Sequence, residues 1–490
     1  MAESKIESHV IQGNLFLPVS DVMLSEVIDE TRELALQHPE ILRMISADLD
    51  RLALEKKQLR IETREWVHAR TEYLPGLEGS GPAQAVAADL QAGRPRMDPE
   101  TVLVFFSISH YFCSVYSGTA TERLLDSLSV YRFLEGKGIE MPGLRTIGDN
   151  VNAMGAETRR HILHCQMQLV LDEKLDDFQE LCGDSTSCAA NTCWPTDSGL
   201  MLRLLERLSR EGSKLEQFGL PNFRTPKKEK WLRELKKLDF EINMAKNKRS
   251  RKRLYKKFLK KAEQAAEHFG EQTLELFDGI AEQDLPPLLM ARLGRKWQVM
   301  LNDVCDLCAI HEQCVARVLD GEKIKGSKRI FSLSDRAAAY ILKGDRDPVV
   351  GYKPQLARSR NGLITALLTP EGNASDSSML VPLVKESIAT TGVVPDLGSF
   401  DDGYTSQVNL KELKGLGLKD VSFSGSKGKK LLADEWESDI LKEARRNRSA
   451  VESLMFCIKH VHEFGQLRRR GIEAIRDELM GKALVYNFCR

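Results

Sequence analysis

The chain has 490 residues, 42% of them hydrophobic, and it carries 71 basic and 71 acidic side chains. This length predicts two or three domains with ample apolar content for their cores. A run of 18 apolar residues is missing, and Met1 to Gly13 lack the apolar stretch of a secretory signal. We therefore expect a cytoplasmic protein without a membrane span, whose ten cysteines are reduced thiols.

The charges are distributed unevenly. Residues 1–100 carry 11 Lys and Arg against 18 Asp and Glu, whereas residues 224–261 carry 17 against 4. The basic stretch is compatible with a polyanion as partner, and the alternative is a solvated helical face.

The first part of the chain is predicted to be helical. Apolar residues recur at helical spacing from Val19 to Val67, which predicts one or two amphipathic helices in a segment spanning residues 1–74. Residues 75–97, rich in Gly, Ala and Pro, predict a linker. Helices are then expected over 100–116, 119–133 and 146–171, in a domain at 98–175. The break at Gly138–Arg145 allows a DNA-binding helix-turn-helix, and an ordinary helical hairpin is the alternative.

Strand signals follow this helical part. Residues 178–194 are rich in Cys, Thr and Ser and predict a strand or hairpin carrying Asp184. Helices return over 200–317. Strands are then expected at 329–333 and on both sides of the turn Ser359–Gly362, because Asn-Gly between two apolar runs favours a hairpin. A helix at 378–390, an apolar stretch ending at Phe400, a helix at 406–416, a strand at 420–424 and a C-terminal helical region complete the chain.

The order of these elements predicts an α/β domain. Without residues 200–325, the chain from 178 onward alternates strands with helices. We therefore expect an α/β domain over 176–490 with a basic helical insertion at about 200–325.

Three acidic residues lie at positions that suit a metal site. Asp184 lies on the first strand, Asp401 at the end of a later strand, and Glu452 on the helix after the last strand. Carboxylates that converge from separate elements can bind two Mg²⁺ ions, which activate a nucleophile and stabilise charge in phosphodiester chemistry. A cap or turn role is the alternative for each Asp alone, and Asp402 competes with Asp401.

Two cations flank Glu452. Spacings of four and seven residues bring Arg448, Glu452 and Lys459 onto one helix face, where the cations could hold DNA phosphates. The alternative is an ordinary surface pair between Arg448 and Glu452. Asp197 and Asp376 could support the metal ligands, with a turn or cap role as the alternative.

The acidic motifs resemble those of insertion-sequence DDE transposases. The first-aspartate motif is similar to Asp184-Ser185-Thr186 followed by Asn191 and Pro195-Thr196-Asp197-Ser198-Gly199-Leu200. The second is similar to Asp401-Asp402-Gly403-Tyr404-x4-Asn409-Leu410, and the C-terminal signature to Arg448-x3-Glu452-x6-Lys459. Arg445 stands where a Tyr is expected. The similarity extends from about residue 95 to the C-terminus.

This resemblance implies a bacterial DDE transposase of the ISNCY-like group, in which an all-α N-terminal region precedes an RNase H-like catalytic domain with a helical insertion after its first strand. Asp184, Asp401 and Glu452 would be catalytic and bind two Mg²⁺ ions, for which Mn²⁺ can substitute, and the motif register favours Asp401 over Asp402. Arg448 and Lys459 would contact the DNA backbone. Water would free a 3′-hydroxyl at the element end, and this hydroxyl would attack target DNA.

The expected partners follow from the same resemblance. They are terminal inverted repeats, target DNA and at least one further copy of the chain in a synaptic complex. In this setting the inserted basic helices are predicted to bind DNA phosphates. The candidate residues are Lys248, Arg249, Arg251, Lys252 and Arg253. A non-catalytic DNA-binding transposase remnant and another RNase H-like nuclease are the alternatives.

A second pattern of ligand-type residues is Cys305-x2-Cys308-x2-His311-x2-Cys314. A spacing of three on a helix turns each side chain by about −60° from the last, so the four fan out instead of converging. We expect a buried helical face here and no zinc site.

Overall fold

The computed structural model describes residues 21–71, 96–111, 127–215, 226–281, 287–342 and 347–490. The chain divides into two compact units. Unit 1 comprises residues 1–61, 79–191 and 337–490, and unit 2 comprises residues 62–78 and 192–336. The predicted linker lies almost entirely outside the described residues, and the predicted domain limits stay predictions.

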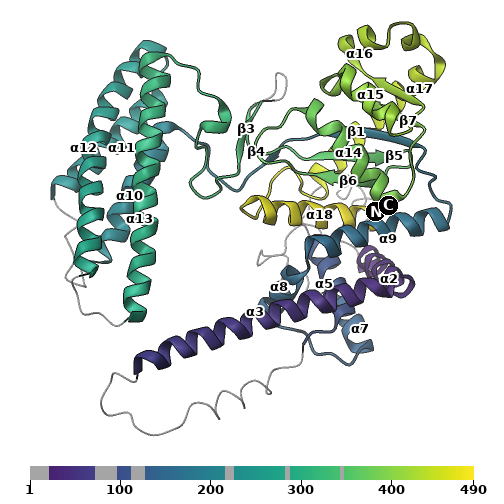
Figure 1. Ribbon diagram of the computed structural model, residues 1–490, viewed down its shortest axis with the longest axis horizontal. Helices are drawn as coiled ribbons and strands as arrows, with labels where there is room; N and C mark the ends of the chain where they lie inside the picture. The colour runs from purple at the N-terminus through teal and green to yellow at the C-terminus, as the bar shows by residue number, and fades with distance from the viewer. Residues whose placement is uncertain (1–20, 72–95, 112–126, 216–225, 282–286, 343–346) are drawn as a thin grey trace, which may run out of the picture. The chain divides into compact units, whose positions relative to one another are not determined.

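The N-terminal part of unit 1 is helical, as its periodicity predicts (Figure 1). Its described helices are α2 (Asp21–Gln37), α3 (Pro39–Thr71), α5 (Pro99–Tyr111), α7 (Leu128–Gly136), α8 (Leu144–Ala153) and α9 (Ala156–Asp172). Helix α5 is buried along almost its whole length, in contact with α2, α8 and α18 (Ile472–Phe488), which explains why it is apolar on every side. The described part of the helix predicted at 119–133 is α7, which begins at Leu128 with the Ser127 hydroxyl as its cap, and residues 112–126 lie outside the described residues.

The single helix predicted at 146–171 is wrong. The helix is interrupted at Met154-Gly155, which separates α8 from α9. The backbone N–H of Gly155 donates to Asp48 Oδ2 at 2.7 Å, and the Thr158 hydroxyl donates to the same oxygen at 2.6 Å. This carboxylate comes from α3, so a distant residue stabilises the start of α9.

A five-stranded mixed sheet forms the centre of the α/β part of unit 1. Its strands are β1 (Glu180–Ser185), β5 (Gln355–Ser359), β6 (Ile364–Leu368), β7 (Leu397–Phe400) and β8 (Asp420–Phe423), in the order β6-β5-β1-β7-β8. Strand β1 pairs parallel with β7 and antiparallel with β5, and β8 extends the sheet parallel to β7. The predicted hairpin is confirmed: β5 and β6 are antiparallel, and Gly362 adopts the positive φ of +98° that the turn requires.

Helices pack on this sheet through an apolar cluster that includes Leu380, Leu383, Phe400 and Phe423. The helices of this part are α14 (Asp376–Thr391), α15 (Gln407–Gly415), α16 (Gly425–Leu432), α17 (Asp439–His460) and α18. Helix α14 contacts β5 and β6, whereas α17 contacts β7 and β8. The helices predicted at 378–390 and 406–416 and the strand at 420–424 are confirmed within one or two residues.

A second, three-stranded sheet has the order β2 (Cys188–Ala189), β4 (Val349–Tyr352), β3 (Ala339–Ile341). The strand predicted at 329–333 is wrong. There the short 3-10 helix η3 (Gly326–Lys328) leads into bends, and the Ser332 hydroxyl accepts hydrogen bonds from the backbone N–H of Ser334 and Asp335. The Ser332 side chain therefore bonds to backbone N–H groups that a neighbouring strand would otherwise bind.

Unit 2 is built from long helices that lie side by side in Figure 1. They are α10 (Asp197–Ser213), α11 (Pro226–Met244), α12 (Lys248–Ala281) and α13 (Pro287–Cys314), followed by the π-helix η2 (Val315–Asp320). Their apolar faces form one core around Leu204, Leu235, Phe258 and Leu307. Within the described residues, we find no helix with both the length and the hydropathy for crossing a membrane.

Candidate catalytic site

Two of the predicted acidic residues lie next to each other in the central sheet. Gly183 of β1 is in register with Phe400 of the parallel strand β7. The residues that follow, Asp184 and Asp401, are therefore neighbours at the carboxyl ends of adjacent strands, where strand spacing is about 4.8 Å. The sheet thus brings together two carboxylates that are far apart in sequence.

Both carboxylates belong to the sheet face that α17 covers. A Cβ on Gly183 would lie 3.0 Å from the Phe400 ring and 3.4 Å from Leu383 of α14, so Gly183 and Phe400 face α14. Side chains alternate along a strand, which assigns Asp184 and Asp401 to the opposite face. On that face the Ser399 hydroxyl donates to the Ala444 carbonyl of α17 at 3.1 Å.

Helix α17 brings the third acidic residue to this face through Arg448. The Arg448 guanidinium lies 3.8 Å from Asp401 Oδ1 and 3.8 Å from Glu452 Oε1. The side chain of Arg448 is 17% exposed, that of Asp401 41% and that of Glu452 71%. The expected surface pair between Arg448 and Glu452 is present, and Arg448 also contacts Asp401 at the end of β7.

Asp401 and Asp402 have different surroundings. Asp401 Oδ1 accepts a hydrogen bond at 2.9 Å from the hydroxyl of Ser424, the residue after β8. Asp402 Oδ1 accepts from the backbone N–H of Lys427 at 3.0 Å and of Gly428 at 3.1 Å, at the N-terminus of α16. Asp402 therefore caps a helix. Sequence reasoning did not find Ser424, whose signal is a hydroxyl residue directly after a buried strand.

A buried polar network supports the loop after β7. The Tyr404 hydroxyl donates to Gln355 Oε1, and Gln355 Nε2 donates to Asp376 Oδ1 at 3.1 Å. Lys353 Nζ lies 2.9 Å from the same Asp376 oxygen. Asn409 Nδ2 donates to the Tyr404 carbonyl at 2.8 Å. The Tyr and Asn of the second motif therefore hold the segment that carries Asp401.

The electrostatics of this network fit a cluster of acids. Burial acts to raise the pKa of Asp376, but hydrogen bonds from Lys353 and Gln355 outweigh it and leave the pKa below its usual value. Burial, and after it the charges of Asp376, Asp184 and Asp401, raise the pKa of Tyr404. Tyr404 is therefore a neutral hydrogen-bond donor beside three carboxylates.

The three predicted ligands supply the donor atoms that a hard cation requires. All are carboxylates, the ligands Mg²⁺ prefers in proteins. Their oxygens do not all lie within 4.8 Å of one another, and the Arg448 guanidinium lies between Asp401 and Glu452. The donor set therefore fits a divalent metal, although the three carboxylates are not gathered around one point in this structure.

The remaining residues of the C-terminal signature lie along α17. Lys459 is half-buried, and its charge lowers the pKa of the buried Cys188 thiol in β2, although burial dominates and raises that pKa to about 12. Arg445, which stands where the sequence resemblance leads us to expect a Tyr, stacks 3.9 Å from the centre of the Trp436 ring and donates to the Trp436 carbonyl at 2.7 Å.

The predicted DNA-binding residues of unit 2 lie in the first turns of α12, and all five are exposed. Two of them bond to backbone carbonyls: Arg251 donates to Ala245 at 2.7 Å and Lys252 to Leu319 at 2.6 Å. Further along, α11 and α12 border a groove of about 480 Å³. Its charged lining comprises Lys237, Lys257, Lys260 and Lys261 with Glu234 and Glu241.

The Cys and His residues of α13 do not form the predicted buried face. Cys314 is buried, but Cys305 and Cys308 are exposed, so this prediction is wrong for two of the three thiols. The spacing of three turns Cys305 and Cys308 away from the core of unit 2, because Leu307 and Ile310 occupy the inward positions. The four residues do not form a metal cluster within the described part of the chain.

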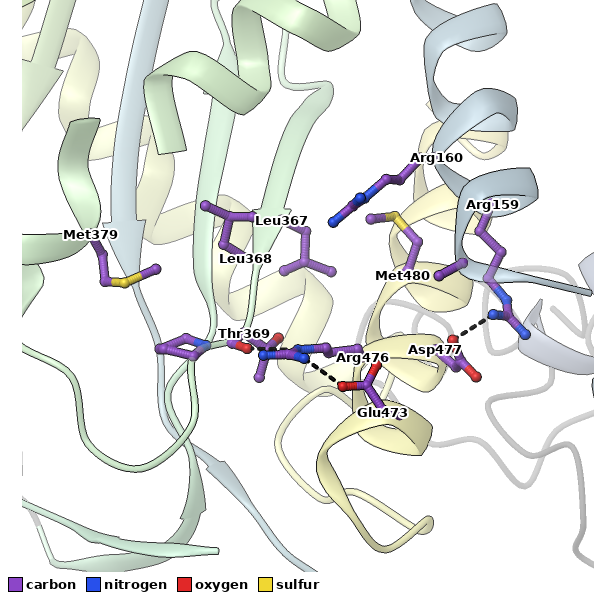
Figure 2. Close-up of a pocket in the computed structure, with 12 residues that line it drawn as sticks. Arg159, Arg160, Leu367, Leu368, Thr369, Met379, Glu473, Arg476, Asp477 and Met480 are labelled. Atoms are coloured by element: carbon purple, nitrogen blue, oxygen red, sulfur yellow. Dashed lines mark hydrogen bonds and ion pairs between the residues drawn. The ribbon is translucent and has the colours of Figure 1, made fainter. Parts of the chain in front are cut away.

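A cavity of about 350 Å³ lies elsewhere in unit 1, among α9, α18 and the end of β6 (Figure 2). Its charged side chains are all in ion pairs: Arg159 lies 2.5 Å from Asp477, Arg476 lies 2.6 Å from Glu473, and Arg160 lies 3.4 Å from Glu386 outside the cavity lining. The predicted ligands are not among its lining residues. The candidate site is therefore the open sheet end and not this cavity.

One comparison with known proteins finds a match. Residues 317–488 match the family model of the transposase DDE domain. The matched stretch contains Asp401, Arg448, Glu452 and Lys459, and Asp184 precedes it. The match supports a DDE transposase, and the mixed sheet with flanking helices is consistent with the RNase H-like fold that such a domain implies. No curated protein and no solved structure matches the chain.

Proposed function

We propose that the chain is a DDE transposase of a bacterial insertion sequence, in the ISNCY-like group. It cleaves DNA at the element ends and transfers the freed 3′-hydroxyl into target DNA. The observation that carries this proposal is the pair Asp184 and Asp401 at adjacent strand ends, on the face where α17 presents Glu452. The transposase domain match over 317–488 supports it.

In this proposal Asp184, Asp401 and Glu452 hold two Mg²⁺ ions, or Mn²⁺ in their place. When bound, the metals activate the attacking hydroxyl and stabilise charge on the phosphate oxygens. Ser424 orients Asp401 through its hydrogen bond, and the Tyr404 network fixes the loop behind it. Asp401 is favoured over Asp402 because Asp402 Oδ1 already caps α16.

DNA is the proposed partner. Arg448 and Lys459 contact backbone phosphates near the metals, and the basic turns of α12 add affinity that does not depend on sequence. Two element ends must be joined, so the active form is at least a homodimer in the synaptic complex.

The test is cleavage of labelled duplex DNA that carries the element's terminal repeats, in the presence of Mg²⁺ or Mn²⁺. Asp184→Asn, Asp401→Asn and Glu452→Gln should each lower nicking by at least about 100-fold, as expected when a group that stabilises the transition state is removed. Asp420→Asn is the matched control, because Asp420 lies at the opposite end of β8. Cleavage that survives the first three substitutions would contradict the proposal.

The same assay separates the alternatives. Retarded migration of the DNA without nicking in Mn²⁺ would favour a non-catalytic transposase remnant. Nicking without transfer of the 3′-end to a second DNA would favour another RNase H-like nuclease. Strand-transfer products that depend on all three carboxylates are the result we expect.

A further inference from the structure

Four side chains of the kinds that bind metals meet in the helical part of unit 1. They lie away from Asp184, Asp401 and Glu452, which we call the acidic site. His38 lies in the joint between α2 and α3, and Glu40 in the first turn of α3. His161 and Cys165 lie four residues apart on α9, and therefore on one face of that helix. Three chain segments thus contribute imidazole, carboxylate and thiol to one place.

The donor atoms are close together. Within the described chain, the ligand atoms of His38, Glu40 and Cys165 all lie within 4.8 Å of one another. Glu40 Oε1 is 3.1 Å from His38 Nδ1, 3.6 Å from His161 Nε2 and 3.7 Å from Cys165 Sγ. Cys165 Sγ is 3.5 Å from His161 Nε2.

These separations resemble the edges of a tetrahedral metal centre. Ordinary zinc–nitrogen, zinc–oxygen and zinc–sulfur bond lengths give ligand-to-ligand edges of about 3.3 to 3.6 Å. Four of the six ligand-to-ligand separations lie within about 0.3 Å of that range. His161 is not among the residues whose ligand atoms all lie within 4.8 Å of one another, so its imidazole must move toward His38 to complete the tetrahedron. A mixed nitrogen, oxygen and sulfur donor set suits Zn²⁺ and does not suit Mg²⁺, which prefers oxygen ligands throughout.

We propose that His38, Glu40, His161 and Cys165 form a structural zinc site. The site goes beyond the proposed transposase function, since its four residues precede the stretch that matches the transposase domain.

The surroundings allow an ion to enter. The side chains of His38, Glu40 and His161 are 19%, 36% and 30% exposed, while Cys165 is buried beneath them. Without metal, Glu40 accepts the hydrogen bond of the thiol and contacts both imidazoles. When Zn²⁺ binds, a sulfur–zinc bond forms and the thiol proton leaves to solvent.

The position of the site gives it a structural consequence. Helix α9 is bonded to the rest of unit 1, because the His164 ring lies 2.7 Å from the Thr390 carbonyl of α14 and Gln166 donates to the Leu484 carbonyl of α18 at 3.0 Å. Zinc at His38 and Glu40 would attach the joint between α2 and α3 to this helix. The bound metal would therefore stabilise the attachment of the N-terminal helices.

The experiment uses the full chain, stripped with a chelator and then titrated with Zn²⁺ or Co²⁺ in excess Mg²⁺, so that the acidic site is occupied by Mg²⁺. We expect about one Zn²⁺ per chain, a higher Tm with zinc, and a thiolate-to-cobalt charge-transfer absorption band. Cys165→Ser should abolish this band. His161→Gln should weaken binding by more than about 100-fold, beyond the loss caused by removing an outer partner of a ligand.

Cys308→Ser and His164→Gln are the matched controls, because the first removes an exposed thiol and the second a neighbouring imidazole on α9. Both should retain the cobalt band. The proposal is overturned if the band persists in Cys165→Ser, if His161→Gln binds zinc as tightly as the unaltered chain, or if that chain takes up no zinc. The partly exposed His161 keeps the test decisive should Cys165→Ser fail to fold.

This test is independent of cleavage. Asp184→Asn should lose DNA nicking and keep the cobalt band, whereas His161→Gln should lose tight zinc binding and keep the acidic site. A failure of one proposal is therefore distinguishable from a failure of the other.

Discussion

The guanidinium of Arg448 lies 3.8 Å from Asp401 Oδ1, and only 17% of the arginine side chain is exposed. Its second contact, with Glu452, makes Arg448 a cation between two of the proposed metal ligands. A partly buried charge pair is screened less by solvent than an exposed one. If these carboxylates bind metal as proposed, Arg448 competes with the metal for them before DNA and ions arrive.

Removing this cation should separate metal binding from cleavage. In Arg448→Gln we expect half-saturation by Mn²⁺ without DNA at a lower concentration, because two carboxylates lose a competing cation. DNA cleavage should nevertheless fall by about 10- to 100-fold through the lost phosphate contact. Arg446→Gln, an exposed position on the same helix, is the control. Unchanged metal titration in Arg448→Gln would argue against the competition.

The two adjacent aspartates should respond differently to substitution. Asp402→Asn keeps a side-chain oxygen for the N–H groups of α16, so both stability and cleavage should change little. Asp402→Ala should cost about 0.5 to 2 kcal/mol in the free energy of unfolding, as for other lost helix caps. Asp401→Asn should abolish cleavage with little change in stability. Urea unfolding and the cleavage assay, run on all three variants, measure both effects, and the opposite pattern would make Asp402 the ligand.

The basic turns of α12 should determine the salt dependence of DNA binding. Replacing Lys248, Arg249 and Arg253 together by Gln should reduce the slope of log affinity against log salt by about 2 to 3, if each contacts one phosphate. Arg251 and Lys252 are left intact because they bond to carbonyls of unit 2.

A control with the same number of neutralised charges is Lys411, Lys414 and Lys419 to Gln. Two of these lysines already lie beside carboxylates, Lys414 near Glu435 and Lys419 near Asp396. If the control reduces the slope as much as the α12 variant does, DNA does not bind preferentially to α12.

Unit 1 should lose stability in mild acid. Burial lowers the pKa of His110 to about 3 and that of His462 to about 4, both from 6.5. Below pH 6.5 the unfolded chain binds these protons and the folded chain does not, so stability falls with pH until each folded-state pKa is reached. Each group contributes roughly 1.4 kcal/mol per pH unit in its window.

Urea unfolding at pH 7 and pH 5 measures this effect. His462→Phe should reduce the pH dependence relative to the unaltered chain, since it removes one of the two buried imidazoles and keeps an aromatic ring beside Tyr486. An unaltered pH dependence would show that His462 does not titrate differently in the two states.

Local sequence patterns predict much of this fold. The turn at Asn361-Gly362 and the periodicity of 19–67 depend on neighbouring residues, and both predictions are confirmed. The break at Gly155 depends on Asp48 of another helix, and the segment at 329–333 on the hydroxyl of Ser332. A sequence window does not contain such partners, which is why these two predictions are wrong.

The candidate site, too, was predictable only in part from the sequence. The motifs identify Asp184, Asp401 and Glu452 as candidates. The helix cap that Asp402 provides was not predictable, because it depends on β8 pairing with β7 and so bringing the start of α16 next to Asp402. Gly425 permits this approach with a φ of +88°, and a Cβ there would lie 2.6 Å from Asp402 Cγ. The cluster around Glu40 is equally hidden from the sequence, because its members come from separate helices.

The parallel pairing of β1 with β7 also affects the way the chain is made. Strand β1 leaves the ribosome before residues 192–336 of unit 2, and its neighbour β7 is synthesised roughly 10 to 40 s later at ordinary elongation rates. Until β5 and β7 have been made, both edges of β1 lack their native partners and can pair with another nascent chain. Unit 2 and the local β5–β6 hairpin can fold in the meantime, so slower translation between β1 and β7 should increase aggregation during synthesis.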